Sequence, residues 1–243
     1  MIDLDSWKDA WFIFKKDLRN DRLYLIWNVI FMLYVALMLG SLVGAREETD
    51  YVMNPMVDFL MLAMVPFTGF FFTRRSFNYI KGDTYTQMLR YYRVLPIPLK
   101  TVIRERLIQL GAAMLLNSVL FYGGIYLVTK LMNNSGLGLG TFIVFALTWN
   151  GYGLLINGVF IYFELLKKGK VYLWLTFLLM LGLGLIAFAA NWFGGNLMSF
   201  TLEFSRQHLV RSPLMWGTLA VGIVGLASLS SVTLRKLNQR DLG

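Results

Sequence analysis

Residues 171–192 read VYLWLTFLLMLGLGLIAFAANW, a run of 22 residues without one charged side chain. An α-helix rises about 1.5 Å per residue, so this run is long enough to cross the ~30 Å hydrocarbon core of a bilayer. Five further runs in the 243-residue chain have the same character. The expected spans lie at about 23–45, 56–73, 107–129, 141–163, 171–192 and 214–234. They predict an all-α membrane protein with six transmembrane helices.

The overall composition supports a membrane protein. Hydrophobic residues make up 57% of the chain and charged residues 15%, against about 25% charged in a typical soluble domain. A water-soluble helical bundle would need polar helix faces, which these runs lack. We expect an interfacial segment at 1–22 and a transmembrane domain at 23–243. The chain has no cysteine, which excludes a disulfide framework, a thiol nucleophile and a thiolate metal site.

The 23 Lys and Arg residues fall mostly in alternate segments between the spans. Nineteen of them lie before the first span, in loop 74–106, in segment 164–170 and after the last span. Basic residues stay on the cytoplasmic side during insertion, so we expect a multi-pass protein of the cell membrane with both termini cytoplasmic. This topology and attraction to anionic membrane lipid explain the net charge of +9, and we expect no nucleic-acid partner.

The N-terminal segment has the pattern of an amphipathic helix. Trp7, Trp11, Phe14 and Leu18 follow each other at spacings of four, three and four residues, which places them on one helix face. We expect this helix to lie in the inner headgroup layer with its aromatic side chains toward the lipid. The alternative is a helix that packs on a partner protein. No cleavable signal peptide is predicted, because the chain starts with a charged amphipathic stretch.

Charged side chains are nearly absent from the predicted spans, and Asp58 is the clear exception. An intramembrane carboxylate is a functional candidate, but Asp58 lies near an outer end, where we interpret it as a hydrated residue or a helix N-terminal charge. His208 lies in the outer segment 193–213, where we expect a short interfacial or re-entrant helix, and we interpret it as a solvated side chain.

Several chemistries lack their usual residues. The sequence has no P-loop motif, no protease motif and no clustered metal ligands, and it shows no acidic relay for proton-coupled transport. We therefore expect no catalytic residue, cofactor or metal in this chain, which is not an enzyme by itself.

Uncharged polar residues do occur within the spans. One interpretation is that they line a path for an amphipathic substrate, and the other, which we favour, is that they form interhelical hydrogen bonds of about 1 kcal/mol each. The candidates are Asn28, Asn117, Tyr122, Asn150, Tyr152 and Asn157.

The long loop 74–106 reads RRSFNYIKGDTYTQMLRYYRVLPIPLKTVIRER and contains eight basic residues. Gly82 and Asp83 predict a turn, followed by a short helix over Thr84–Val94 that the two prolines at 96 and 98 end. A helix is expected to restart at Ile97–Arg106 and enter the third span. The short helix is predicted to present Tyr85, Met88, Leu89, Tyr91 and Tyr92 to a partner. The alternative is a solvated basic loop that only sets topology.

This loop carries a resemblance to a known family. Gly82, Thr84, Leu89 and Leu95-Pro96-Ile97 are similar to the Gly-Thr-x-x-x-Leu-x-x-x-Pro-Leu/Ile run of the permease subunits of type-2 ABC exporters. The layout of the whole chain also resembles that family, with an interfacial helix, six spans and both ends inside. The second proline, Pro98, and the Tyr91-Tyr92 pair depart from the pattern and change the register of the loop helix.

The resemblance implies a driven export mechanism. Two permease copies, identical or paralogous, would pair, and each would be gripped by a separate ATPase subunit that binds ATP and Mg. Family cargoes include amphipathic peptides, which we prefer, as well as lipid-linked glycans, haem-related compounds and drugs. Alternatives are a non-transport scaffold or receptor subunit and, less favoured, a passive channel or secondary carrier. The residues expected to couple the chain to the ATPase are Asp83, Thr84, Tyr85, Met88, Leu89, Arg90, Tyr91 and Arg93.

Overall fold

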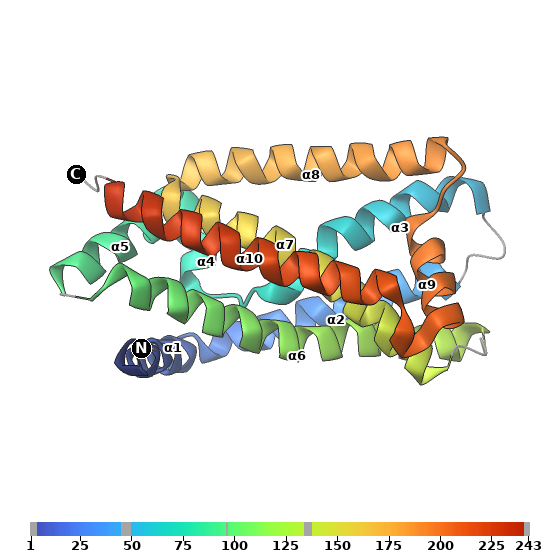
Figure 1. Cartoon of the computed structure of the whole chain (residues 1–243), viewed down its shortest axis with the longest axis horizontal. Coiled ribbons are helices and arrows are strands. Elements are labelled where there is room, and N and C mark those ends of the chain that lie inside the picture. Colours follow the sequence, from blue (N-terminus) through green and yellow to red (C-terminus); the bar gives the residue numbers. More distant parts are fainter. Residues whose placement is uncertain (1–3, 45–49, 96, 134–137, 241–243) are drawn as a thin grey trace.

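The computed structural model describes residues 4–44, 50–95, 97–133 and 138–240, and in these residues the fold is helical without a strand (Figure 1). The elements are α1 (Leu4–Asn20), α2 (Arg22–Gly44), α3 (Asp50–Met64), η1 (Val65–Gly69), α4 (Arg74–Gly82), α5 (Thr84–Val94), α6 (Leu99–Asn133), α7 (Leu139–Leu166), α8 (Gly169–Trp192), α9 (Leu197–His208), η2 (Leu209–Arg211) and α10 (Pro213–Gln239). Labels with η mark short 3₁₀ helices.

Five helices, α2, α6, α7, α8 and α10, are long and apolar enough to cross a membrane. A sixth span results if α3 with η1 is counted together with α4, but these two pieces meet at an angle of 118°. By length and composition, this pattern suits a membrane protein, as the hydropathy of the sequence predicts.

The prediction of one continuous second span at 56–73 is wrong. The α-helix ends at Met64, Pro66 lies in the first turn of η1, and Phe70 adopts an extended conformation. Proline supplies no backbone N–H for the helix that precedes it, which favours the break. Thr73 then caps the N-terminus of α4 by accepting a hydrogen bond from the Ser76 N–H at 3.2 Å. The apolar run is therefore long enough for a span but is not one helix.

The long helices lie side by side, and the start of α1 and the end of α10 lie near α5 at one end of the bundle (Figure 1). We call this the α5 end and the opposite one, where α9 lies, the α9 end. Helix α7 packs on α10 and α2 packs on α6. At the α7–α10 crossing, a side chain at Gly222 would overlap the Gly151 carbonyl oxygen. Small residues of this kind let membrane helices approach closely.

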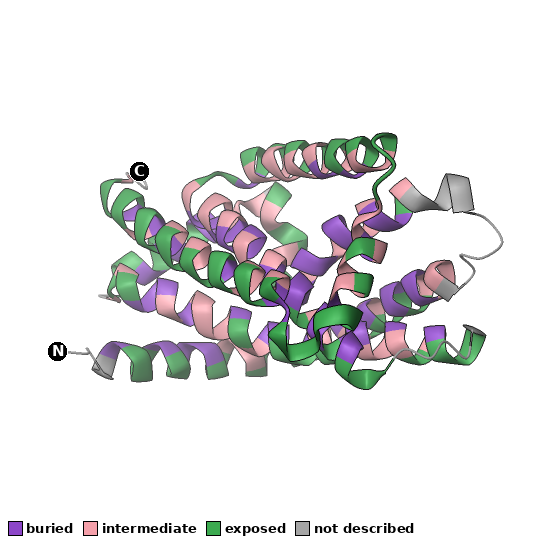
Figure 2. Ribbon diagram, turned by 45° about the vertical axis from the view of Figure 1, so that its right-hand side comes forward, coloured by how far each residue is buried: buried purple, intermediate pink, exposed green. Residues whose placement is uncertain are grey.

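Two apolar clusters make up most of the interior. One lies between α2, α3, α6 and α7, and it includes Leu39, Met61, Ile125 and Phe145. The other closes the α5 end with residues from α1, α5, α6, α7 and α10. Large apolar side chains also cover the outside, most densely along α8 (Figure 2). Such a surface is expected where lipid is the solvent.

Helix α1 packs on α6, and the face it buries differs from the predicted stripe. The buried side chains are Ser6, Ala10, Ile13 and Phe14. Trp7 and Trp11 remain partly exposed and carry Arg104 and Lys15 over their rings, while Leu18 is half-buried. The four stripe residues therefore do not share one environment. The prediction that the stripe faces lipid is wrong for Phe14, which is buried, while the two indoles are exposed and their place in the headgroup layer stays a prediction.

Candidate functional site at the α5 end

Helix α5 begins at Thr84 and ends at Val94, as the sequence predicts. Asp83 adopts a left-handed conformation with φ of 45° between α4 and α5. Its carboxylate accepts a hydrogen bond from the Gly169 N–H at 2.9 Å, which attaches the start of α8 to this turn. Residue 169 must be small, because a side chain there would overlap the Tyr79 carbonyl oxygen. The restart predicted at Ile97 occurs at Leu99, since a residue before proline disfavours helix.

The prediction that α5 presents its aromatic and apolar side chains to a partner is wrong for four of the five residues. Tyr85, Met88, Leu89 and Tyr92 are at most 7% exposed and pack against the bundle. Their spacing of three and four residues forms one helix face, which closes the α5 end. Burial raises the pKa of Tyr92 to about 12, so its phenol is neutral. Of the expected coupling residues, Arg90, Tyr91 and Arg93 stay exposed, and Asp83 and Thr84 are half-buried.

Two arginines fasten α5 to the ends of α7 and α10. The Arg93 guanidinium donates to the carbonyl oxygens of Leu237 at 3.3 Å and Arg240 at 2.8 Å. Arg240 donates in turn to the Leu165 carbonyl oxygen at 2.6 Å and the Thr86 hydroxyl at 3.1 Å. The last carbonyls of a helix lack partners within it, so arginine side chains can satisfy them. These bonds connect α5 directly to both helix ends.

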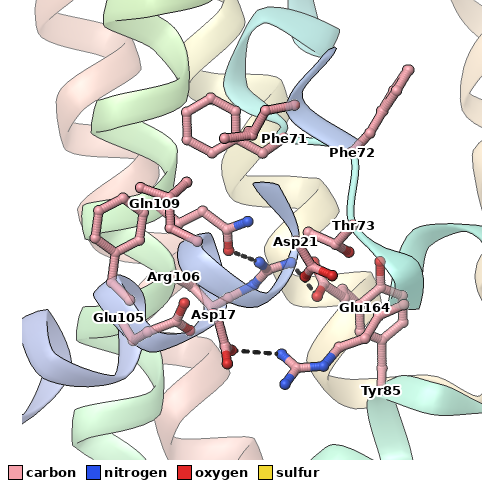
Figure 3. Close-up of a pocket in the computed structure, with 14 residues that line it drawn as sticks. Asp17, Asp21, Phe71, Phe72, Thr73, Tyr85, Glu105, Arg106, Gln109 and Glu164 are labelled. Atoms are coloured by element: carbon pink, nitrogen blue, oxygen red, sulfur yellow. Dashed lines mark hydrogen bonds and ion pairs between the residues drawn. The ribbon is translucent and has the colours of Figure 1, made fainter. Parts of the chain in front are cut away.

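Beneath α5 lies a group of charged side chains, which we call the charge cluster: Asp17, Arg75, Glu105, Arg106 and Glu164 (Figure 3). Arg75 of α4 pairs with Asp17 of α1 at 3.0 Å. Arg106 of α6 pairs with Glu164 of α7, which is 1% exposed, and also donates to Gln109. The cavity among these groups has a volume of about 20 Å³, enough for one water molecule.

The charge cluster contains two buried carboxylates that lie just outside the predicted spans. Glu105 and Glu164 are each at most 2% exposed and belong to the long helices α6 and α7. Glu105 lies two residues before the span predicted at 107–129, and Glu164 lies one residue after the span predicted at 141–163. The composition of the predicted spans therefore does not include these carboxylates. The helical spacing was a signal of their burial, because Glu105 is three residues after the buried Val102 and therefore lies on the same helix face.

Asp58 is fully buried and bonded to the start of α9, at the α9 end of the molecule. Its carboxylate accepts hydrogen bonds from the backbone N–H groups of Leu197 at 2.7 Å and Met198 at 2.9 Å. These are the first residues of α9, so Asp58 is a helix N-terminal charge, although for a different helix from its own. The hydrated alternative is wrong. His208 is exposed and stacks on Phe204, and the described residues contain no group of metal ligands.

Asn117 lies at the centre of the break in the second span. Its amide N–H groups donate to the carbonyl oxygens of Thr68 at 3.1 Å and Phe70 at 2.8 Å, and its oxygen accepts from Asn28 at 2.7 Å. Backbone carbonyls freed from a helix at membrane depth need such partners, because the hydrocarbon offers none. Asn117 thus joins α2 and α6 to the broken segment.

The other polar candidates make similar bonds. Asn157 of α7 donates to the Pro66 carbonyl oxygen at 3.1 Å, and the Tyr152 hydroxyl donates to that of Leu62 at 2.8 Å. Asn150 accepts from Ser118 at 2.8 Å, whereas the hydroxyl of the buried Tyr122 has no partner among the described residues. The favoured interpretation, interhelical hydrogen bonding, is therefore observed for five of the six candidates. Their role in a path stays a prediction.

Two cavities lined largely by aromatic side chains lie beside the break, and the polar candidates line neither. One, of about 220 Å³, is formed by η1, α4, α7 and α8 and includes Phe70, Phe160 and Tyr172. The other, of about 660 Å³, lies between α2 and α4. The two share Phe72 and Phe77, and we call them the aromatic cavities. In the sequence, these cavities correspond to the dense run of Phe residues at 67–77.

Comparisons of this chain with protein-family models, with curated proteins and with solved structures found no match. A function therefore has to rest on the geometry of the chain itself.

Proposed function

We propose that this chain is the membrane-spanning subunit of an ATP-driven exporter that moves an apolar or amphipathic molecule, preferably a peptide, out of the cytoplasm or inner leaflet. The alternation of basic residues orients the α5 end, with both termini, toward the cytoplasm. A separate ATPase subunit binds ATP and Mg, and two permease copies pair in the working complex.

The observation that carries the proposal is the placement of α5. This short helix is exposed on one face, at Gln87, Arg90 and Tyr91, and its opposite face packs into the cluster that joins α6, α7 and α10. A force applied to the exposed face is therefore transmitted to three long helices. Such a helix suits a coupling element between an external motor and the membrane domain.

The break in the second span supports the same proposal. Helix α4 connects α5 to the non-helical residues 70–73, where the chain turns by 118°. The carbonyl oxygens of Phe70 and Pro66 accept hydrogen bonds from Asn117 and Asn157 on neighbouring helices. Displacement of α4 would therefore change these side-chain hydrogen bonds and leave the backbone hydrogen bonds of the flanking helices intact. A bend of this kind offers the permease a place to move.

The aromatic cavities support the class of cargo. Most of their lining is Phe, Tyr or Trp, and hydroxyl groups from Ser76, Tyr79 and Thr176 face the smaller one. Cavities with apolar walls and a few polar groups bind amphipathic molecules. An apolar cargo in the inner leaflet would reach them from the side of α2 and α4.

The proposal is tested by recovering the full-length, tagged chain from its native membranes and identifying the P-loop ATPases that co-purify. We expect Arg90→Glu to reduce the recovered ATPase, because it reverses a charge on the exposed face of α5. Arg206→Glu, at an exposed position on α9, is the matched control and should recover the wild-type amount. Equal recovery from both variants, or transport by the purified chain without an ATPase, contradicts the proposal.

The charge cluster favours one second candidate, a secondary carrier driven by protons. Buried carboxylates are what such carriers use, and Glu105 and Glu164 provide them. Proton-dependent substrate uptake into liposomes that contain only this protein would support the carrier. Loss of all uptake when the ATPase is left out would support the exporter.

A further inference from the structure

The charge cluster contains one more acidic group than it has cations. Arg75 pairs with Asp17 at 3.0 Å, and Arg106 pairs with Glu164. Glu105 is 2% exposed, and no hydrogen bond or ion pair joins its carboxyl group to another described residue. With every carboxyl group ionised, the five side chains would carry a net charge of −1 in a buried site.

The charged groups that line the same cavity as Glu105 come from several helices (Figure 3). They are Asp17 of α1, Asp21 before α2, Arg75 of α4, Arg106 on its own helix and Glu164 of α7; Tyr92 of α5 also interacts electrostatically with Glu105. Each of the two arginines is already engaged with another carboxylate. Three of the neighbours are themselves acidic, and a like charge close by disfavours a second ionised carboxylate.

A buried carboxylate without a cation of its own is costly, and such a group takes up a proton instead. We propose that Glu105 is a proton-binding site, in which the packed cluster holds one proton on this carboxyl group while Asp17 and Glu164 keep their ion pairs with Arg75 and Arg106. The step is a simple protonation, carboxylate plus H⁺ giving the carboxylic acid, with no other bond changed.

The cavity beside Glu105 offers the route for the proton. It accommodates one water molecule, and its wall includes Glu105, Asp21 and Glu164. The second carboxylate oxygen of Glu164, Oε2, is buried without a hydrogen-bond partner among the described residues. A water there can accept a hydrogen bond from the protonated Glu105 carboxyl group and donate one to Glu164 Oε2, which satisfies that oxygen. Asp21, near the start of α2, is half-buried and leads toward solvent.

The proton ties the contact between α1 and α6 to pH. That contact includes Ile13 and a hydrogen bond of 3.1 Å between the hydroxyl groups of Ser6 and Thr101, and Asp17 of α1 lines the same cavity as Glu105. The packed state binds the proton and the separated state, in which Glu105 meets water, releases it. Packing of α1 is therefore strongest at low pH and weakens as the pH rises. This inference stands on the charge arrangement alone and does not require an ATPase.

Infrared spectroscopy of the full-length chain in lipid nanodiscs at neutral pH tests the proposal directly. The wild-type protein should show the C=O stretch of a protonated carboxyl group, and Glu105→Gln should lose it. Glu203→Gln, at an exposed position on α9, should retain the band. Glu164→Gln frees Arg106 and leaves two acids with two cations in the cluster, so Glu105 should ionise and the band should weaken. The proposal is overturned if the wild-type protein lacks the band, if it persists in Glu105→Gln, or if Glu203→Gln abolishes it.

Thermal unfolding of the same variants separates protonation from misfolding. Glutamine resembles the protonated acid in shape and charge but takes up no proton on folding, so Glu105→Gln should unfold at a higher temperature than the wild-type protein at neutral pH. It should also show less pH dependence between the ordinary titration range of glutamate and neutral pH. A lower unfolding temperature for Glu105→Gln at neutral pH, with an unchanged pH dependence, would show that an ionised Glu105 stabilises the fold and would contradict the proposal.

Discussion

Replacing Asn117 with leucine removes three hydrogen bonds from the break in the second span. The side chain donates to the carbonyl oxygens of Thr68 and Phe70 and accepts from Asn28, at distances of 2.7 to 3.1 Å. Leucine has a similar volume and no polar atom. It therefore leaves two freed backbone carbonyls and one amide without partners in a site that excludes water.

The expected loss of stability follows from these bonds. Side-chain hydrogen bonds in membrane helices contribute about 0.6 kcal/mol each on average and about 1.7 kcal/mol at most. Three of them give a loss of about 2 kcal/mol, with an upper value of about 5 kcal/mol. Asn28→Leu removes one of the same bonds, so the double variant should fall short of additivity by about 0.6 kcal/mol.

Reversible unfolding in mixed detergent and lipid micelles measures these differences. The matched control is Ser118→Ala, one residue further along α6, which loses a single hydrogen bond to Asn150 and should cost about 0.6 kcal/mol. A loss for Asn117→Leu no greater than that of Ser118→Ala would refute the reasoning. Strict additivity with Asn28→Leu would refute the bond between the two asparagines.

Two further predictions concern packing and charge. Gly222→Ala should destabilise the protein by about 1–3 kcal/mol, because the added methyl group overlaps a carbonyl oxygen of α7. The control Gly217→Ala lies on the same helix with open space around it and should be neutral or slightly stabilising. Thermal unfolding distinguishes the two variants. Arg106→Gln should cost about 3–5 kcal/mol in the same measurement, since it leaves Glu164 buried without its cation, whereas the exposed Arg206→Gln should change little. Equal unfolding temperatures within either pair would contradict the corresponding contact.

Hydropathy and helix signals predict much of this molecule. Five of the six apolar runs form continuous helices, because a span needs only length and apolar character. The bounds of α5 follow from local chemistry. Asp83 adopts the left-handed conformation that precedes the first residue of the helix, and Pro96 and Pro98 prevent the helix from continuing beyond Val94. These features depend on residues close together in the sequence.

Local sequence patterns do not predict the features that depend on residues distant in the sequence. A window average over 56–73 cannot show that Pro66 breaks the helix, because the break is tolerated only through Asn117 and Asn157 on other helices. The outward turn of the indoles on α1 likewise depends on α6. In a membrane, an apolar stripe does not say which face meets protein, since lipid satisfies apolar side chains equally well.

The attachments of α8 have a mechanical consequence for the two ends of the molecule. Its first residue, Gly169, is bonded to the Asp83 turn, and α9 follows its last residue closely and is held by Asp58 of α3. A helix of 24 residues is about 36 Å long and scarcely stretches. Helix α8 thus keeps a constant distance between its two attachment points. A displacement of the Asp83 turn along α8 must either move α9 or break one of the two attachments, so the α5 end and the α9 end of this protein cannot be adjusted independently.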